Sequence, residues 1–342
     1  MPAGRAIAIT QGDCAGIGPE TIAKAFRDAP DALRGCFIVG EVATLRRAAE
    51  VVLAQGNTSL PVAIIGNPDE AWSVPPRCLP VLALAGLPGP APWGRISRAA
   101  GEAAARCVEW AAQAALDGKI AALVTAPLHK EALALAGVDF PGHTELLQAA
   151  AARNAGVALA DMPVRMMLAN DELRTVLVSI HMSLRAALEA VTEAQVLQTL
   201  RITHEALTRT LGRAPRIAVA GLNPHAGEGG LFGLEERDII APAVAAACAE
   251  GIDATGPYAP DTVFMRARAG AFDVVVAMYH DQGLIPVKYL GVEHGVNVTL
   301  GLPLVRTSPD HGTAFDIAGK GIADPASLLA AIRMARALVR SA

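Results

Sequence analysis

Short apolar runs rich in β-branched residues alternate along the whole chain with longer, Ala-rich stretches. The short runs have the length of buried strands, and the longer stretches carry enough Leu, Ala, Glu and Arg to sustain helices. This alternation predicts βαβ units, and hence a mostly parallel sheet covered by helices on both faces. The expected strands are 6–10, 36–40, 62–66, 121–125, 175–180, 217–221 and 274–278, and the expected helices include 99–117, 186–211 and 235–250. The Pro-rich segment 79–93 is expected to be a surface connection.

Composition limits the possible partners. A chain of 342 residues with 52% hydrophobic content can bury a large core, and its length favours two domains or one large one. Aromatic residues make up only 4%, and the net charge is −4, so neither base stacking nor overall attraction favours a nucleic acid. An anion site would have to be local.

The compartment follows from what the sequence lacks. The five cysteines are widely spaced without a C-x-x-C pair, which indicates reduced thiols. No apolar run approaches the about 18 residues of a membrane span, and no secretory signal is recognisable. We therefore expect a cytoplasmic protein without membrane association.

Three of the expected strands lead into a histidine at their carboxyl ends: His181, His225 and His280. In open parallel sheets this edge is where ligands bind. Three neutral imidazoles that leave one position open are typical of a catalytic zinc site. For each histidine alone, a capping role or a hydrogen-bonded place in the core is the simpler interpretation. The agreement among the three favours a divalent metal site.

A second group of residues suggests an anion site. His143 and Thr144 follow Gly142 at the expected start of a helix, where free backbone N–H groups attract phosphate or carboxylate. An ordinary N-cap would explain Thr144 equally well. Lys288, Asn297 and Arg306 interrupt an otherwise apolar stretch, which indicates a buried anion site, although for either cation alone a side chain that reaches solvent is the simpler reading.

The amino-terminal segment 12–20, GDCAGIGPE, joins an expected strand to an expected helix. Its glycines allow close approach of a ligand to the backbone, or only a tight turn. It does not match G-x-G-x-x-G, and no G-x-x-x-x-G-K-[ST] occurs in the chain, so no dinucleotide fingerprint or triphosphate loop is present.

Taken together, six segments resemble the 4-hydroxythreonine-4-phosphate dehydrogenase family of vitamin B6 synthesis. They are spread over nearly the whole chain, from Thr10 to Ala314. In order they are TQGDCAGIGPE, VTAPLHKEAL, FPGHTE, LNPHAGE, MYHDQG and GVNVTLGLPLVRTSPDHGTA.

The resemblance implies the roles of the site residues. It implies that His181, His225 and His280 bind one divalent metal ion, such as zinc, magnesium or cobalt. It further implies that a small phosphorylated hydroxy acid is contacted by His143, Thr144, Lys288, Asn297 and Arg306. The DHGTA segment also resembles the adenosine-binding loop of isocitrate and isopropylmalate dehydrogenases, which implies that NAD or NADP contacts His311, Gly312, Thr313, Ala314 and Asp316.

The resemblance also implies a fold and an assembly. The fold would consist of two α/β/α domains with mixed, mostly parallel sheets, of the isocitrate/isopropylmalate dehydrogenase type. We expect 1–130 with 288–342 to form the cofactor-side domain and 131–287 the metal, substrate and dimerisation domain, with the active site in the cleft between them. A homodimer with its site at the subunit interface is implied as well.

The expected reaction is oxidation of 4-phosphooxy-L-threonine by NAD at its secondary alcohol, followed by loss of carbon dioxide. Asp281 and Lys130 are the candidate general bases. The sequence departs from the biosynthetic pattern at Cys14 and His129, and the 283–288 and 315–317 segments resemble relatives that act on threonate or erythronate 4-phosphate. A sibling dehydrogenase for those substrates or for a cyclic diol carboxylate is one alternative, and a non-catalytic metabolite-binding protein is another.

Overall fold

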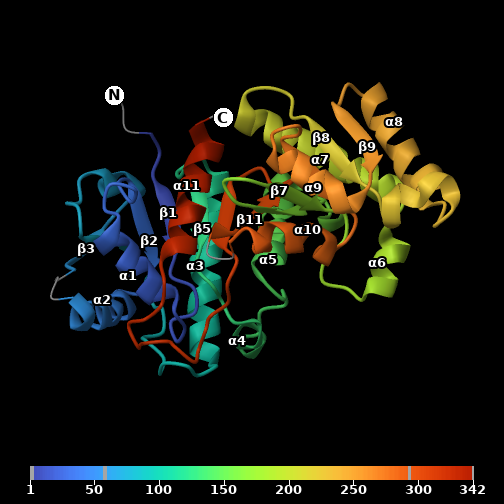
Figure 1. Ribbon diagram of the computed structural model, residues 1–342. Helices are drawn as coiled ribbons and strands as arrows, with labels where there is room; N and C mark the ends of the chain where they lie inside the picture. Colours follow the sequence, from blue (N-terminus) through green and yellow to red (C-terminus); the bar gives the residue numbers. More distant parts are fainter. Residues whose placement is uncertain (1–3, 57–59, 292–293, 341–342) are drawn as a thin grey trace. The chain divides into compact units, whose positions relative to one another are not determined.

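The computed structural model describes residues 4–56, 60–291 and 294–340 (Figure 1). The chain divides into two compact units: unit 1 is Met1–Pro163 with Leu302–Val339, and unit 2 is Val164–Gly301 with Arg340–Ala342. The sequence places the divisions after residues 130 and 287, so 131–163 and 288–301 lie in the other unit from the one expected. The predicted α/β class with mostly parallel strands is confirmed in each unit.

Unit 1 is built on parallel strands in the order β3-β4-β2-β1-β5-β12. Residues opposite Ile7 of β1 are Cys36 of β2 and Ala122 of β5, so these strands end level with one another. The strands are β1 (Ile7–Thr10), β2 (Cys36–Gly40), β3 (Val62–Ile65), β4 (Leu79–Ala83), β5 (Ala122–Thr125) and β12 (Arg306–Pro309). The helices are α1 (Gly18–Asp28), α2 (Val42–Gly56), η1 (Pro68–Trp72), α3 (Arg98–Leu116), α4 (Lys130–Leu135), α5 (His143–Ala155), η2 (Leu159–Asp161) and α11 (Ala326–Arg340).

Unit 2 has the strand order β11-β6-β7-β10-β8-β9. Strand β6 pairs antiparallel with both neighbours, and β7, β10, β8 and β9 are parallel. The strands are β6 (Arg165–Ala169), β7 (Arg174–Leu177), β8 (Ile217–Ala220), β9 (Ala254–Tyr258), β10 (Val274–Ala277) and β11 (Val296–Leu300). The helices are α6 (Leu184–Ala190), α7 (Glu193–Leu211), η3 (Pro224–Gly230), η4 (Glu236–Ile240), α8 (Ala241–Ala249), α9 (Pro260–Arg268) and α10 (His280–Tyr289).

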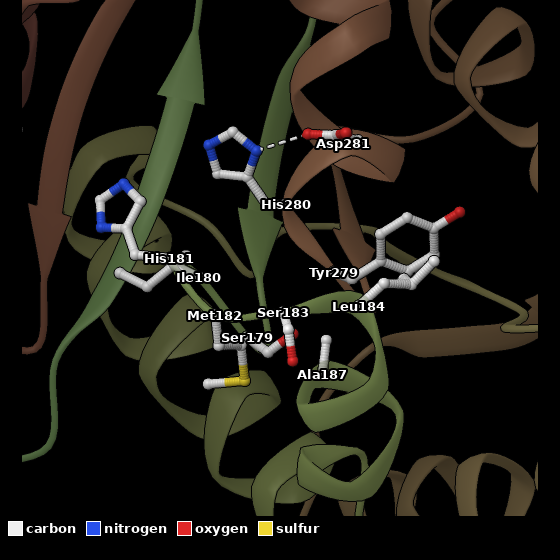
Figure 2. Close-up of a pocket in the computed structure, with 10 residues that line it drawn as sticks. All are labelled: Ser179, Ile180, His181, Met182, Ser183, Leu184, Ala187, Tyr279, His280 and Asp281. Atoms are coloured by element: carbon white, nitrogen blue, oxygen red, sulfur yellow. Dashed lines mark hydrogen bonds and ion pairs between the residues drawn. The ribbon is translucent and has the colours of Figure 1, made fainter.

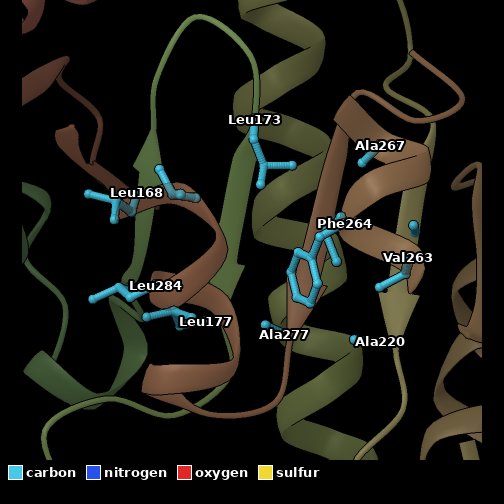
Figure 3. Packing of buried hydrophobic residues seen from close by; sticks show 12 residues of the cluster. Leu168, Leu173, Leu177, Ala220, Val263, Phe264, Ala267, Ala277 and Leu284 are labelled. Carbon is cyan, nitrogen blue, oxygen red and sulfur yellow. The ribbon is translucent and has the colours of Figure 1, made fainter. Parts of the chain in front are cut away.

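The core of unit 2 lies where α9 and α10 pack on the sheet (Figure 3). Phe264 and Val263 of α9 and Leu284 of α10 meet Leu177 of β7 and Ala277 of β10 in one buried cluster. This packing holds the carboxyl ends of β7 and β10 beside the start of α10. It thereby fixes the position of the segments that carry His181 and His280.

A glycine allows α4 to lie directly against α3. A Cβ atom on Gly101 of α3 would lie 1.9 Å from the carbonyl oxygen of Ala132 in α4, far inside any real contact. Helix α5 also packs on α3. These contacts explain why 131–155 belongs to unit 1 and not, as expected, to the other domain.

The expectation of a surface connection over 79–93 is wrong for its first part. Leu79–Ala83 forms β4, which lies between β3 and β2 in the sheet order. Leu79 and Val81 are fully buried. The stabilisation from burying these two side chains outweighs the loss of one strand-to-strand hydrogen bond at Pro80, which has no backbone N–H.

Two expected helices are not continuous. The stretch 186–211 is interrupted at Val191 and Thr192, and the Thr192 hydroxyl caps the start of α7 by accepting the Gln195 N–H at 3.3 Å. The stretch 235–250 begins with the π-helical turn Glu236–Ile240 before α8. All five cysteines are free, as expected, and no helix within the described ranges is long and apolar enough to cross a membrane.

Candidate functional site

His181 and His280 lie side by side beyond the ends of adjacent parallel strands. Leu177 of β7 pairs with Ala277 of β10, and each strand continues into its histidine within four residues. The two ring centroids are 5.7 Å apart at an interplanar angle of 45° (Figure 2). Both rings line a cavity of about 430 Å³, together with Met182, Ser183 and Tyr279 among others.

Asp281 contacts His280. His280 Nδ1 lies 2.7 Å from Asp281 Oδ1, and Figure 2 shows Asp281 on the side of the ring away from His181. A carboxylate on one ring nitrogen leaves Nε2 available to a ligand and orients the imidazole, as in many metal sites. His181 has a φ of +48°, a left-handed conformation that is uncommon outside functional turns. The pair therefore fits two ligands of a divalent metal ion.

His225 is held in a separate turn. It follows β8 within η3, where His225, Ala226 and Glu228 all have φ between +43° and +54°. Its ring lies 6.3 Å from that of Phe232. Among the described residues of one chain, no three His, Cys, Asp or Glu side chains are grouped to hold a metal ion. One chain thus brings together two of the three histidines.

Arg306 is the centre of a buried cationic site in unit 1. It begins β12 and is only 3% exposed, and its Nη2 donates to the Thr125 hydroxyl at 2.7 Å. Burial lowers the pKa of Arg306 to about 10, and Glu145 opposes this shift, so the guanidinium stays charged at neutral pH. Thr125, at the end of β5, was not among the predicted site residues, because only the pairing of β5 with β12 reveals its place.

His143 adjoins this guanidinium at the start of α5. Its Nε2 is buried without a hydrogen-bond partner, although the residue as a whole is partly exposed. Burial, and then the charge of Arg306, hold the pKa of His143 well below its usual 6.5. Gly142, and not Thr144, is the N-cap, so Thr144 lies in the first turn. A buried guanidinium and an uncapped helix start suit an anion.

The remaining predicted substrate residues and the candidate bases have different surroundings. Lys288 lies in the last turn of α10 and Asn297 in β11, and both are partly buried in unit 2. Lys130 is exposed at the first position of α4 in unit 1, and the Asp281 carboxylate is also exposed. Both candidate bases are therefore accessible to solvent.

The predicted cofactor segment packs against the amino-terminal glycine loop. Ile17 N–H donates to the Thr313 carbonyl at 3.0 Å, and a Cβ atom on Gly16 would lie 2.9 Å from that same oxygen. The loop at 12–18 is therefore more than a tight turn, because it supports the 311–316 segment. Ala314 has a φ of +42°, a left-handed conformation that is uncommon outside glycine.

Several buried polar atoms near this segment have no partner among the described residues. They are Asp13 Oδ2, His129 Nδ1 and His311 Nε2. The His129 ring stacks on Phe315 with centroids 5.0 Å apart and an interplanar angle of 13°. Burial raises the pKa of Asp13 above its usual range. Because buried polar groups are normally paired, these atoms fit a polar ligand such as a dinucleotide.

Comparison with known proteins places this geometry in a family. Residues 32–335 match the family described as pyridoxal phosphate biosynthetic protein PdxA. The chain belongs to this family. A 4-hydroxythreonine-4-phosphate dehydrogenase of Beijerinckia indica is 54% identical over 94% of this chain and 91% of the relative. A D-threonate 4-phosphate dehydrogenase of Cupriavidus necator is 47% identical, and the match covers 96% of this chain and 95% of that relative.

A crystal structure shows the same fold. The 4-hydroxythreonine-4-phosphate dehydrogenase of Klebsiella pneumoniae is 44% identical, with a TM-score of 0.86 over 98% of this chain and all of the other. The family resemblance inferred from the six segments is thus confirmed. As a PdxA family member, the chain is an oxidoreductase whose relatives are named dehydrogenases.

In this family member, the buried ion pair between Lys24 and Glu20 anchors the segment that follows the predicted cofactor contacts. Lys24 Nζ donates to the carbonyls of Gly321 and Ala323 at 2.7 and 2.6 Å, and Glu20 accepts from the N–H groups of both residues. Replacing Lys24 by Met should lower the free energy of unfolding by about 3–5 kcal/mol, because the buried Glu20 carboxyl group would lose its cationic partner. Urea denaturation measures this loss.

The matched control is Lys119→Met, which removes an exposed ion pair with Asp117 and should change stability little. A Lys24→Met variant as stable as this control would contradict the role of the buried pair.

The depressed pKa of His143 predicts a pH dependence of stability. The folded chain binds this proton less readily than the unfolded chain, so stability is full above pH 6.5 and falls as pH drops below it. The slope approaches about 1.4 kcal/mol per pH unit. His143→Gln should flatten this slope between pH 6.5 and 5 in urea titrations. An unchanged slope would show that His143 ionises freely in the folded protein.

Proposed function

We propose that this chain oxidises 4-phosphooxy-L-threonine with NAD to 2-amino-3-oxo-4-phosphooxybutanoate, which then decarboxylates to 3-amino-2-oxopropyl phosphate. The observation that carries the proposal is the buried Arg306 guanidinium beside His143 and Thr125. A charged guanidinium that is only 3% exposed, with a helix N-terminus and His143 beside it, can give a phosphate monoester charge-assisted hydrogen bonds in a site of low dielectric constant. The name of the 54% identical relative supports the same substrate.

The phosphate would act as the binding handle of the substrate. Arg306, His143 and Thr144 would hold it, with Lys288 and Asn297 as the further predicted contacts. Binding energy from this remote group positions the reacting carbon. The depressed pKa of His143 keeps its imidazole neutral before the substrate binds, so the ring would add no charge of its own to the phosphate site.

His181 and His280 would hold a divalent metal ion, zinc, magnesium or cobalt, with His225 as the third ligand. When bound, such an ion lowers the pKa of a coordinated hydroxyl and stabilises negative charge beside a carbonyl. Asp281 keeps the His280 ring oriented for this task. Residues 311–316 would hold NAD or NADP, which would supply a hydride acceptor for the C3 hydrogen. The hydroxyl proton would pass to a base, for which Asp281 and Lys130 are the candidates.

We propose that a second copy of the chain supplies His225, in a homodimer. The segments next to the histidines expose large apolar side chains, between 44% and 73% accessible, which is typical of an interface. These are Met182, Leu184, Leu188, Leu231, Phe232 and Leu234. Light scattering should give a dimer mass that persists on dilution, and a stable monomer with full activity would exclude this arrangement.

We also propose that the enzyme acts in the cytoplasm.

D-Threonate 4-phosphate is the second candidate substrate. The His129–Phe315 stack occupies positions where the sequence departs from the biosynthetic pattern, and the 47% identical relative carries that activity in its name. The phosphate site would serve either compound equally. The difference would lie at C2, which bears an amino group in one and a hydroxyl in the other.

The deciding experiment compares kcat/KM for a substrate panel. Metal-loaded protein with NAD is assayed for NADH formation with 4-phosphooxy-L-threonine, D-threonate 4-phosphate, D-erythronate 4-phosphate and a cyclic cis-diol carboxylate. We expect the highest value for 4-phosphooxy-L-threonine. A higher value for a threonate or erythronate phosphate would assign the sibling function, and no turnover with any compound would favour a metabolite-binding protein.

A further inference from the structure

A buried carboxylate lies behind the turn that carries His225. Glu236 is 5% exposed and stands at the start of the π-helical turn after that loop. Its Oε1 accepts the N–H groups of Leu222 and Asn223, both at 2.7 Å, and its Oε2 accepts the Asn223 side-chain amide at 2.9 Å. Because all three donors belong to the loop before His225, the carboxylate stabilises the conformation of that loop.

The loop closes tightly around this carboxylate. A Cβ atom on Gly227 would lie 2.8 Å from Glu236 Oε2, and one on Gly221 would lie 3.0 Å from Oε1. Between these glycines, His225 and Ala226 adopt left-handed backbone angles, which cost about 1–2 kcal/mol per residue outside glycine. Such a conformation persists only where the surroundings determine it. Glu236 provides that constraint at the entrance of the turn.

A second side chain ties the ends of two strands together. Gln282 Nε2 donates to the Gly221 carbonyl at 2.7 Å, and its Oε1 accepts the Met278 N–H at 2.7 Å. Met278 lies two residues before His280, and Gly221 follows β8 on the path to His225. Ser179, two residues before His181, donates through its hydroxyl to the Met278 carbonyl at 2.9 Å. All three histidine segments are therefore linked through these bonds.

We propose that Glu236 and Gln282 are positioning residues that set the metal-binding geometry of the histidine turns. Glu236 holds the left-handed turn of His225, and Gln282 fixes the spacing between the ends of β8 and β10. The inference rests on the proposed metal site and adds the residues that shape it. Neither side chain needs to touch metal or substrate.

The test measures metal affinity in the full-length protein. Glu236→Gln keeps the shape of the side chain but replaces one accepting oxygen by an NH₂ group that faces the N–H donors of the loop. Gln282→Leu removes the hydrogen bonds to Met278 and Gly221 while keeping a similar side-chain volume. Each variant should raise the Kd for Co²⁺, measured by chelator competition, by about 10- to 100-fold, as is usual for groups that orient metal ligands. Glu228→Gln is the matched control, because it removes the same charge from an exposed position in the same loop.

A second readout needs no metal. In the metal-free protein, Glu236→Gln should speed hydrogen exchange of the Leu222 and Asn223 amides while the β10 amides keep their protection. A merely structural role would lower the Tm and speed exchange throughout unit 2, and it would leave the Kd of the folded variants unchanged.

The outcomes separate the two proposals. A Kd within about twofold of wild type for Gln282→Leu and for any folded Glu236→Gln would overturn the inference while leaving the proposed function intact. If the wild-type protein itself binds no Co²⁺, the metal part of the proposed function fails. In that case, unchanged hydrogen exchange at Leu222 and Asn223 in Glu236→Gln would overturn the proposal that Glu236 stabilises the turn. Faster exchange at these two amides would support it.

Discussion

Replacing His280 by alanine should remove the bound metal ion and lower kcat by about 10³-fold or more. The metal contribution to such a reaction amounts to several kcal/mol of transition-state stabilisation, and each 1.4 kcal/mol corresponds to about tenfold in rate. His280 is the histidine whose ring is both paired with His181 and oriented by Asp281. Its loss leaves His181 as the one imidazole that the same chain presents at the cavity.

The measurement combines metal analysis of the dialysed protein with steady-state kinetics. His204→Gln is the control, because His204 lies on α7 and is not among the residues that line the cavity. It should retain one metal ion per chain and the wild-type rate. Full activity of His280→Ala after exhaustive chelation would refute the metal role of the paired histidines.

Replacing Arg306 by methionine should lower kcat/KM for a phosphorylated substrate by about 10²- to 10³-fold. Removing one partner of a buried, hydrogen-bonded charge pair costs about 2–5 kcal/mol, and methionine keeps much of the side-chain volume. Inorganic phosphate should inhibit the wild-type enzyme competitively and the variant much less.

The control is Arg95→Met, which removes an exposed guanidinium from unit 1. It should leave kcat/KM and phosphate inhibition unchanged. If Arg306→Met lost no more activity than Arg95→Met, the buried guanidinium would have a structural role, and the phosphate handle would have to lie elsewhere.

The sequence predicted the strands that are simple apolar runs. Val274–Ala277 and Ile217–Ala220 are buried on both faces and therefore read as continuous β-branched segments. Strand β4 was not predicted, because Pro80 lies in a Pro-rich segment that is typical of a surface connection. The antiparallel strand β6 escaped because its partly buried start at Arg165 and Met166 gives no clear pattern.

Local patterns also predicted that His181 and His280 lie together, and that His143 and Arg306 lie together, but not how they do so. His181 and His280 adjoin because β7 and β10 are parallel neighbours in register, which strand-end logic anticipates. The left-handed turn of His225 depends on Glu236, eleven residues further on, and no local propensity encodes it. Thr125 and the contact between Ile17 and Thr313 join segments far apart in the chain, and only the folded sheet reveals them.

The contact between α3 and α4 has an evolutionary consequence. At Gly101 the obstacle is a carbonyl of the main chain, so no rearrangement of neighbouring side chains could make room for even one methyl group. Any substitution there would push α4 outward and carry Lys130 and the adjoining His129 with it. One codon change at position 101 would therefore shift His129 and Lys130 together. For the same reason, a substitution of Gly101 would not be selectively neutral.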